Sequence, residues 1–340
     1  MQPEQVAAYL QHKMPAARDI AVEKLARIPG GASRETWSFD ATWREGETAD
    51  APPGKGGFIL RRDPEAGLLD TERNVEFRVY QALQGTGVPV PEVFWLETDP
   101  AWLERPFFVM RRLAGETSPQ RLVASAFGGN AEAIARQKID ILARIHGLDW
   151  SSSGGLGLDF LGVPEGPASC AEREIARWES IMRAQEMEPQ PALDLAIAWL
   201  RAHRPVAQKI ALVHADYRTG NFLVEGGKIV GVLDWEMVHL GDPLEDVAWV
   251  CLRSWRWAGD ARVGGLLLRE EFYRRYEAAS GLLVDAEAVR FWEVLGNLKL
   301  AVIFLTGARS FAEGRSKDAV HAFTAHLNPE IEAEILRLIA

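Results

Sequence analysis

The feature that most constrains this chain is a polar loop at residues 214–221, His-Ala-Asp-Tyr-Arg-Thr-Gly-Asn, which follows a short apolar stretch typical of a strand. After the loop, two apolar runs separated by Gly226-Gly227 predict a hairpin, because paired glycines favour the tight turn between antiparallel strands. The hairpin begins next to Asn221 and ends next to Asp234, so it fixes the spacing between these two side chains. The sequence therefore predicts a rigid frame that carries Asp216, Asn221 and Asp234.

These three side chains suit phosphoryl transfer, which needs an oriented hydroxyl, a metal on the triphosphate and a rigid frame. Asp216 lies between a strand and a loop, where a carboxylate can orient a hydroxyl or accept its proton. Asn221 offers a neutral oxygen and Asp234 a charged one, and Mg²⁺ prefers such hard oxygen ligands. The spacing also matches the protein-kinase catalytic loop, H-R-D-x-x-x-x-N. The plain alternative is an ordinary turn followed by an exposed hairpin acid.

Composition excludes several other classes of protein. Hydrophobic residues make up 47% of the 340 residues and charged residues 25%, so a packed core is expected. A net charge of −10 argues against wrapping a nucleic acid. The two cysteines, Cys170 and Cys251, lack disulfide-framework or metal-ligand spacing. Without a signal-like N-terminus or an apolar run of roughly 20 residues, we expect a soluble cytoplasmic protein with no membrane partner.

Along the chain, a front third rich in strand patterns precedes a remainder rich in helix patterns, which predicts an α+β fold rather than an alternating α/β one. Residues 50–57 are rich in Pro and Gly and are expected to form a turn or loop. The other expected elements are a helix at 4–14, strands at 21–28, 37–43, 58–61 and 107–110, a helix at 70–84, helices that include 134–145, 193–200 and 290–308, and a loop at 151–167.

Residues near the N-terminus give weaker signals for nucleotide binding. The glycine-rich turn Pro-Gly-Gly-Ala-Ser at 29–33 could place the backbone of Gly30 and Gly31 and the hydroxyl of Ser33 against phosphates. Arg61, on a strand, is positioned to meet a triphosphate, and Glu76, on the following helix, to pair with it. Each of these signals is common by itself, and only the downstream motif gives them weight.

Other polar residues near the motif are interpreted as structural. His214 is expected to be a hydrogen-bonded scaffold residue rather than a general base. His239 and Gly-Asp-Pro at 241–243 predict a turn and a helix start, where Asp242 and Asp246 would hold backbone or loop groups. The tryptophans that follow this segment are expected to pack in the core or in a pocket wall.

Together, the segments 214–221, Val-Leu-Asp-Trp-Glu at 232–236 and Gly-Asp-Pro-Leu-Glu-Asp at 241–246 resemble the aminoglycoside phosphotransferase and choline kinase-like family of small-molecule kinases. The similarity runs from about residue 20 to the C-terminal region. Weaker matches are Glu-Phe-Arg-Val-Tyr-Gln-Ala-Leu at 76–83 and Phe-Val-Met-Arg-Arg-Leu at 108–113.

This resemblance implies a protein-kinase-like bilobal fold, with a small antiparallel sheet lobe at 1–110, a hinge at 111–115 and a helical lobe at 116–340. It implies ATP and Mg²⁺ as cofactors and a hydroxyl group of a small molecule as acceptor. Asp216 would be the catalytic base, and Asn221 and Asp234 would bind the metal. The hinge backbone at Arg111 and Leu113 would meet adenine.

Segments around Arg177-Trp178, residue 191 and residues 199–205 resemble one branch of the family, the kinase domain fused to acyl-CoA dehydrogenases. This branch implies a hydroxyacyl-CoA or a related metabolite as acceptor. The alternatives are an aminoglycoside or macrolide antibiotic kinase and a nucleotide-binding pseudokinase. The pseudokinase alternative rests on Arg61, where the family usually has Lys; a guanidinium can still grip phosphate oxygens, although its geometry differs.

Overall fold

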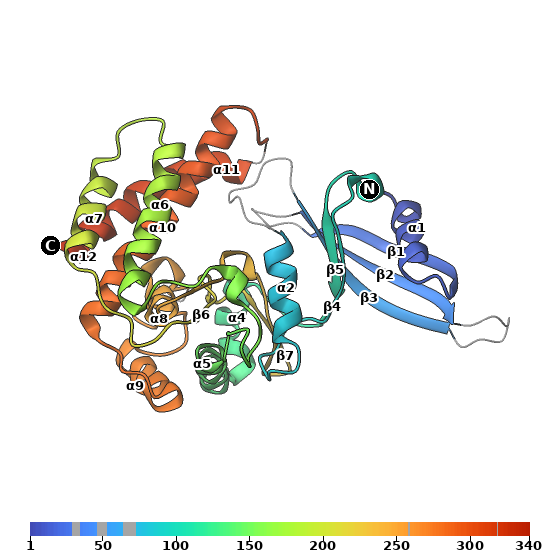
Figure 1. The fold of residues 1–340 in the computed structure, drawn as a ribbon, viewed down its shortest axis with the longest axis horizontal. Coiled ribbons are helices and arrows are strands. Elements are labelled where there is room, and N and C mark those ends of the chain that lie inside the picture. Colours follow the sequence, from blue (N-terminus) through green and yellow to red (C-terminus); the bar gives the residue numbers. More distant parts are fainter. Residues whose placement is uncertain (29–34, 46–52, 64–72, 258, 318) are drawn as a thin grey trace. The chain divides into compact units, whose positions relative to one another are not determined.

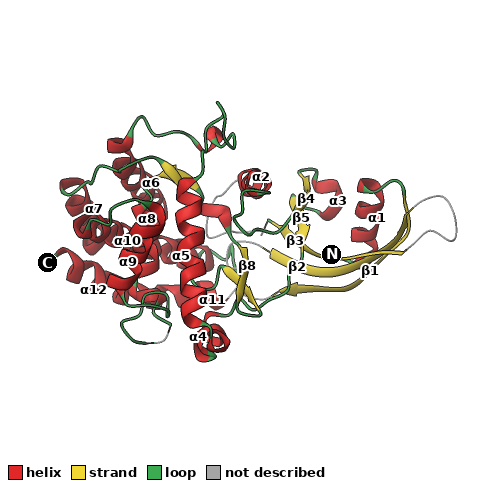
Figure 2. Ribbon diagram, turned by 90° about the horizontal axis from the view of Figure 1, so that it is seen from below, coloured by secondary structure: helices red, strands yellow, loops and turns green. Residues whose placement is uncertain are grey.

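The computed structural model describes residues 1–28, 35–45, 53–63, 73–257, 259–317 and 319–340. The chain divides into two compact units. The smaller comprises Met1–Gln81 and Pro91–Leu113, and the larger comprises Ala82–Val90 and Ala114–Ala340. Figure 2 shows that the long strands belong to the smaller unit and most helices to the larger one. The expected α+β class, with an N-terminal antiparallel sheet and a helical remainder, is confirmed.

The smaller unit is built on a five-stranded sheet in the order β1-β2-β3-β5-β4, with every neighbouring pair antiparallel. Helix α2 carries Glu76 and follows β3 in the sequence. The elements of this part of the chain are α1 (Pro3–Lys13), β1 (Ala17–Ile28), β2 (Glu35–Glu45), β3 (Pro53–Arg62), α2 (Arg73–Leu83), β4 (Val93–Glu97), α3 (Pro100–Leu103) and β5 (Phe107–Arg111).

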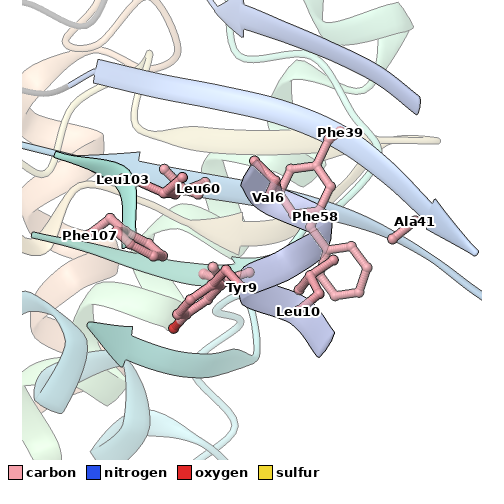
Figure 3. Packing of buried hydrophobic residues seen from close by; sticks show 10 residues of the cluster. Val6, Tyr9, Leu10, Phe39, Ala41, Phe58, Leu60, Leu103 and Phe107 are labelled. Carbon is pink, nitrogen blue, oxygen red and sulfur yellow. The ribbon is translucent and has the colours of Figure 1, made fainter. Parts of the chain in front are cut away.

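Helix α1 covers the apolar face of this sheet. Its residues Val6, Tyr9 and Leu10 recur at helical spacing, and all three are completely buried. Figure 3 shows them against Phe39 of β2 and Phe58 of β3, whose rings stack with centroids 5.3 Å apart. The sheet of the smaller unit therefore has a core of its own.

The expected turn at 50–57 is wrong for residues 53–57, which form the first half of β3 and pair with β2. The reason is cross-strand packing. A Cβ on Gly54 would lie 2.4 Å from the Trp43 ring, so glycine here makes room for a large aromatic side chain on the neighbouring strand. Glycine in a strand interior often marks such a close approach. Strand β4, which pairs with β5 at the sheet edge, was not predicted from the sequence.

The larger unit is mainly helical (Figure 1) and contains two small antiparallel strand pairs, β6 with β9 and β7 with β8. The β7–β8 pair is the predicted hairpin, which is confirmed. Its elements are α4 (Pro119–Ala124), α5 (Ala131–Gly147), α6 (Cys170–Gln185), α7 (Pro191–Ala202), β6 (Ala211–Val213), β7 (Phe222–Glu225), β8 (Lys228–Val232), β9 (His239–Gly241), α8 (Leu244–Cys251), α9 (Arg269–Ser280), α10 (Ala286–Ala312), α11 (Ala319–Thr324) and α12 (Asn328–Ile339), with short 3-10 turns between them.

One expectation needs correction in this unit. His239 does not lie in a turn but in β9, which pairs with β6 immediately before the polar loop. The expected helix start follows it, as α8 begins at Leu244. In the described part of the chain, no helix combines the length and the apolar character needed to cross a bilayer.

Candidate active site

The polar loop is shaped by a carboxylate on α8. Asp246 is fully buried and accepts hydrogen bonds from the backbone N–H groups of His214 and Ala215, both at 2.8 Å. Ala215 has φ +65°, a left-handed conformation that turns the chain sharply before Asp216. Burial opposes ionisation of Asp246, but His146 and His214 outweigh it and lower the pKa of this carboxyl. The expected role of Asp246 in holding the loop backbone is thus confirmed.

Two further side chains, those of His214 and Lys299, form hydrogen bonds that hold the loop. Nε2 of His214 lies 3.0 Å from the Leu233 carbonyl oxygen, and its Nδ1 accepts from the Asp216 N–H at 3.1 Å. These bonds confirm His214 as a scaffold residue. From α10, the Lys299 ammonium donates to the carbonyl oxygen of Ala215 at 2.6 Å. The backbone on the N-terminal side of Asp216 is therefore fixed by both its N–H and its C=O groups.

The Asp216 carboxylate is held by three donors. Oδ1 accepts from Nε1 of Trp249 and from Nε of Arg218, both at 2.9 Å, and Oδ2 accepts from Nδ2 of Asn221 at 2.5 Å. A carboxylate has about four lone-pair positions. The arrangement therefore occupies three and leaves one for a further donor, such as a substrate hydroxyl.

Asn221 and Asp234 are connected through the backbone of the β7–β8 hairpin. The Leu233 N–H donates to the Asn221 carbonyl oxygen at 2.8 Å, so the residue before Asp234 is tied directly to Asn221. Asp234 has φ +68°, a second left-handed position at the end of the hairpin. Since Asn221 directs its Nδ2 toward Asp216, its Oδ1 points elsewhere. A neutral amide oxygen and a carboxylate are the donor types that suit Mg²⁺.

Trp249 was not identified from the sequence as a neighbour of Asp216. It lies on α8 three residues after Asp246, and residues at this spacing share one helix face. The face that holds the loop backbone through Asp246 therefore also presents the Trp249 indole to Asp216. The spacing from Asp246 was the available signal. For Lys299 no comparable signal exists, because it reaches the loop from a helix 84 residues further along the chain.

A second buried cluster, Glu174, His239 and Glu245, has ligand atoms within 4.8 Å of one another, close enough to hold a metal ion. Cations already balance it. Nζ of Lys299 lies 3.5 Å from Glu245, and a guanidinium nitrogen of Arg177 lies 3.7 Å from Glu174. Burial disfavours a charged His239, but the two glutamates outweigh it and raise the His239 pKa. The cluster is therefore interpreted as a charge network beneath the loop.

Lys138 of α5 lies under the other side of the loop. Its carbonyl oxygen accepts from the Tyr217 hydroxyl at 2.7 Å, and its Nζ lies 4.8 Å from the centre of the Phe222 ring. Within the described residues, Nζ has no hydrogen-bond partner. Burial lowers the pKa of Lys138 to about 7, so the ring faces offset only part of the desolvation cost.

In the smaller unit, the expected pair is formed. Nη1 of Arg61 on β3 lies 2.6 Å from Oε1 of Glu76 on α2, and both side chains are buried. Buried opposite charges at this distance form a strong charge-assisted hydrogen bond that fixes the guanidinium on the sheet.

The other residues expected to bind nucleotide are placed as follows. Gly30, Gly31 and Ser33 lie outside the described residues. Arg111 ends β5, and its guanidinium is bonded to Glu92 at 2.6 Å, so its side chain has a partner separate from the expected role of its backbone. Leu113 follows the strand and is half-buried.

Known proteins resemble this chain in sequence and in fold. A sequence model of the phosphotransferase enzyme family (APH) matches residues 24–292. Among curated proteins, acyl-CoA dehydrogenase family member 10 of Mus musculus is 34% identical over 199 residues, which is 57% of this chain and 18% of that protein. Acyl-CoA dehydrogenase family member 11 of Mus musculus is 26% identical over 93% of this chain and 42% of its own length. The chain thus spans less than half of these relatives.

A hygromycin-B 4-O-kinase of Escherichia coli is 24% identical over 67% of this chain and 62% of that protein. Solved structures share the fold. A candidate aminoglycoside phosphotransferase of Ralstonia eutropha has a TM-score of 0.72 at 22% identity, covering 99% of this chain and 98% of that one. Aminoglycoside phosphotransferase APH(4)-Ia, solved as a D198A mutant with ADP and hygromycin B, has a TM-score of 0.61 at 18% identity, covering 98% of both chains.

Proposed function

This chain belongs to the phosphotransferase enzyme family, and we propose that it transfers the γ-phosphoryl group of ATP, with Mg²⁺, to a hydroxyl group of a hydroxyacyl-CoA or a related metabolite. The observation that carries the proposal is the Asp216 carboxylate, which three donors hold with one acceptor position left. A carboxylate fixed in this way can accept a hydrogen bond from the substrate hydroxyl and align it for in-line attack. Positioning of the reacting groups is a large part of catalysis of phosphoryl transfer.

The remaining residues are assigned roles in the same reaction. Asn221 Oδ1 and the Asp234 carboxylate would hold Mg²⁺, which neutralises charge on the triphosphate oxygens. Arg61, fixed by Glu76, would bond to phosphate oxygens. The backbone of Gly30 and Gly31 and the hydroxyl of Ser33 would contact phosphates, and the backbone at Arg111 and Leu113 would contact adenine. The presence of Asp216, Asn221 and Asp234 together argues against a pseudokinase.

The choice of acceptor rests on the curated relatives. Acyl-CoA dehydrogenase family members match between 57% and 93% of this chain, and the first of them is 34% identical. Hygromycin-B 4-O-kinase supports an antibiotic acceptor as the second candidate, with a lower identity of 24%. We therefore place a hydroxyacyl thioester first and an aminoglycoside second.

The test is a coupled ADP-release assay across hydroxyacyl-CoA thioesters, free hydroxy acids, amino alcohols, sugars and hygromycin B. We expect the highest kcat/KM with a hydroxyacyl-CoA. Asp216→Asn should lower kcat by roughly 10²- to 10⁴-fold and leave ATP affinity nearly unchanged, because the interaction matters mainly in the transition state. Near-wild-type turnover of Asp216→Asn would remove this residue from the mechanism, and a preference for hygromycin B would replace the proposed acceptor.

A further inference from the structure

The larger unit contains an arginine-lined cavity of about 540 Å³ in a chain whose net charge is −10. Its walls come from the last third of the chain, which is orange to red in Figure 1: the segment after α8, helix α9, helix α10 and helix α12. Five guanidinium groups line it together with two carboxylates, those of Glu293 and Glu334. The arginines are Arg253, Arg256, Arg269, Arg290 and Arg337.

Both carboxylates are already bonded to arginines. Arg269 binds Glu293 through two bonds of 2.6 and 2.7 Å. Arg337 binds Glu334 in the same way, at 2.6 and 2.9 Å. Arg290 also lies 3.7 Å from Glu287, a carboxylate outside the lining. Five guanidinium groups against these three carboxylates leave an excess of two positive charges.

Among the described residues that line the cavity, Arg256 is the arginine without a direct ion pair, although its charge is near enough to help lower the pKa of Glu334. Its Nε is buried from solvent, and within the described part of the chain this atom has no hydrogen bond. Nor does its guanidinium form an ion pair with any described residue, although it lines the same wall as Arg253. Buried N–H groups in folded proteins are nearly always hydrogen-bonded, so an unsatisfied guanidinium that lines a cavity points to an anionic ligand.

The cavity adjoins the Asp216 site through a short segment of chain. Trp255 lies 5.6 Å, ring to ring, from Trp249, whose indole bonds to Asp216. The Arg218 guanidinium, also bonded to Asp216, lies 4.8 Å from the Trp255 ring. The neighbours of Trp255 in the sequence, Arg253 and Arg256, line the cavity. One short turn therefore contacts two residues that bond to Asp216 and also lines the positive cavity.

A second cavity, of about 420 Å³, lies beside the first. It shares the Arg253–Glu334 wall with the arginine-lined cavity and is bounded on another side by Asn297 of α10. The preceding residue, Gly296, faces Trp249, since a Cβ there would lie 3.4 Å from that ring. The second cavity is therefore lined by the residue that follows, in α10, the glycine packed against Trp249.

We propose that the arginine-lined cavity binds the phosphate-bearing end of the acceptor whose hydroxyl reacts at Asp216; this inference rests on the proposed function. Its volume falls within the ordinary range for ligand sites. The planar fork of arginine matches phosphate oxygens and remains charged at any physiological pH. The acceptor class that fits is a hydroxylated molecule with a phosphorylated tail, such as a coenzyme A thioester. The phosphate groups of a separate effector would bind arginines in the same way as those of the acceptor. The experiments below therefore distinguish the acceptor from a separate effector.

The test compares Arg256→Gln with wild type on two acceptors, a hydroxyacyl-CoA and the corresponding hydroxyacyl-pantetheine, which lacks the phosphates. A charge-assisted hydrogen bond lost to phosphate lowers kcat/KM by about 10- to 150-fold. We expect this loss for the coenzyme A thioester, mostly through KM, and no more than about a twofold change for the pantetheine thioester. Arg274→Gln is the matched control, because Arg274 is an exposed arginine of α9 that does not line the cavity. Equal losses on both acceptors, or no loss on either, would overturn the proposal.

Binding without turnover separates the cavity from the kinase assignment. Coenzyme A is titrated calorimetrically into protein saturated with a non-hydrolysable ATP analogue, and Arg256→Gln should weaken its Kd by the same factor. Competitive inhibition by coenzyme A against the thioester acceptor would support the proposal that the cavity binds the tail of the acceptor. Non-competitive inhibition would instead mean that the cavity binds a separate effector. Binding that does not depend on Arg256 refutes the site itself. Binding that depends on Arg256 in a protein inactive on every acceptor would instead refute the proposed function.

Discussion

The Arg61–Glu76 pair and the Asp216 loop are both buried polar arrangements, but they are held in different ways. In the pair, one charged side chain on β3 meets another on α2 at 2.6 Å. In the loop, most bonds involve the backbone: Asp246 accepts from two N–H groups, and Lys299 donates to a carbonyl oxygen. Substitutions can remove either partner of the pair, whereas they leave the loop's own backbone groups in place.

The difference predicts how each arrangement responds to substitution. A buried charge whose partner is removed keeps its desolvation cost without compensation. Substituting either member of the pair should therefore cost about as much as substituting both. The loop distributes its bonds over side chains from α8 and α10, and a histidine of α5 in turn contacts the α8 carboxylate. Substitutions that leave these bonds intact should therefore affect one chemical role at a time. The following experiments probe this contrast, from the largest expected effect to the smallest.

Asp234→Ala should have the largest effect, because it removes the charged one of the two proposed metal ligands. Residues that merely orient a ligand already contribute about 10- to 100-fold to metal affinity, so loss of a direct ligand should exceed roughly 100-fold. Asn221→Ala should weaken metal-dependent ATP binding less, since it loses a neutral oxygen, but it should also lower kcat by releasing Oδ2 of Asp216. Calorimetric titration of ATP with and without Mg²⁺ measures the order, and an unchanged magnesium effect in Asp234→Ala would place the metal elsewhere.

The Arg61–Glu76 pair is tested by a double-mutant cycle. Arg61→Ala should lower kcat/KM for ATP by roughly 10- to 150-fold, because a charge-assisted hydrogen bond to phosphate is lost. Glu76→Ala should cost a similar amount by leaving the guanidinium misplaced, and the double variant should be far from additive. Arg61→Lys serves as the conservative control and should keep measurable activity. Additive losses would mean that the two residues act separately.

A pH titration of stability tests Lys138, beneath the loop. In the folded protein its pKa is about 7, against an ordinary value of 10.5 for an unfolded chain. Between these values the unfolded state binds more protons, so raising the pH should stabilise the wild type through this group, by at most about 1.4 kcal/mol per pH unit. Below pH 7 both states hold the proton and the contribution to the slope vanishes.

Lys138→Met should remove that part of the slope and stabilise the protein most at pH 7, with the gain shrinking toward pH 10. Urea unfolding at pH 7, 8 and 9 measures the difference between variant and wild type. Lys228→Met, at an exposed lysine of β8, is the control and should leave the slope unchanged. If Lys138→Met keeps the wild-type slope, the lysine remains charged in the folded state.

Local signals in the sequence predicted the fold class, the β7–β8 hairpin and the scaffold role of His214, because each depends on residues close together in the chain. The Trp249–Asp216 and Lys299–Ala215 bonds were not predicted, since they join residues 33 and 84 positions apart and only the packing of α8 and α10 brings them together. The first half of β3 was missed because its glycines are typical of turns, and their role becomes apparent only beside Trp43. The arginine-lined cavity has no sequence pattern, because its charges come from four separate segments.

The bond from Lys299 to the Ala215 carbonyl has a consequence for synthesis on the ribosome. The loop that carries Asp216 leaves the exit tunnel well before α10, because Ala215 and Lys299 are 84 residues apart in the chain. At about 5 to 20 residues per second, a nascent chain spends several seconds with the loop translated and its clamp not yet made. We therefore expect activity to appear only after α10 has been translated and has packed against the loop.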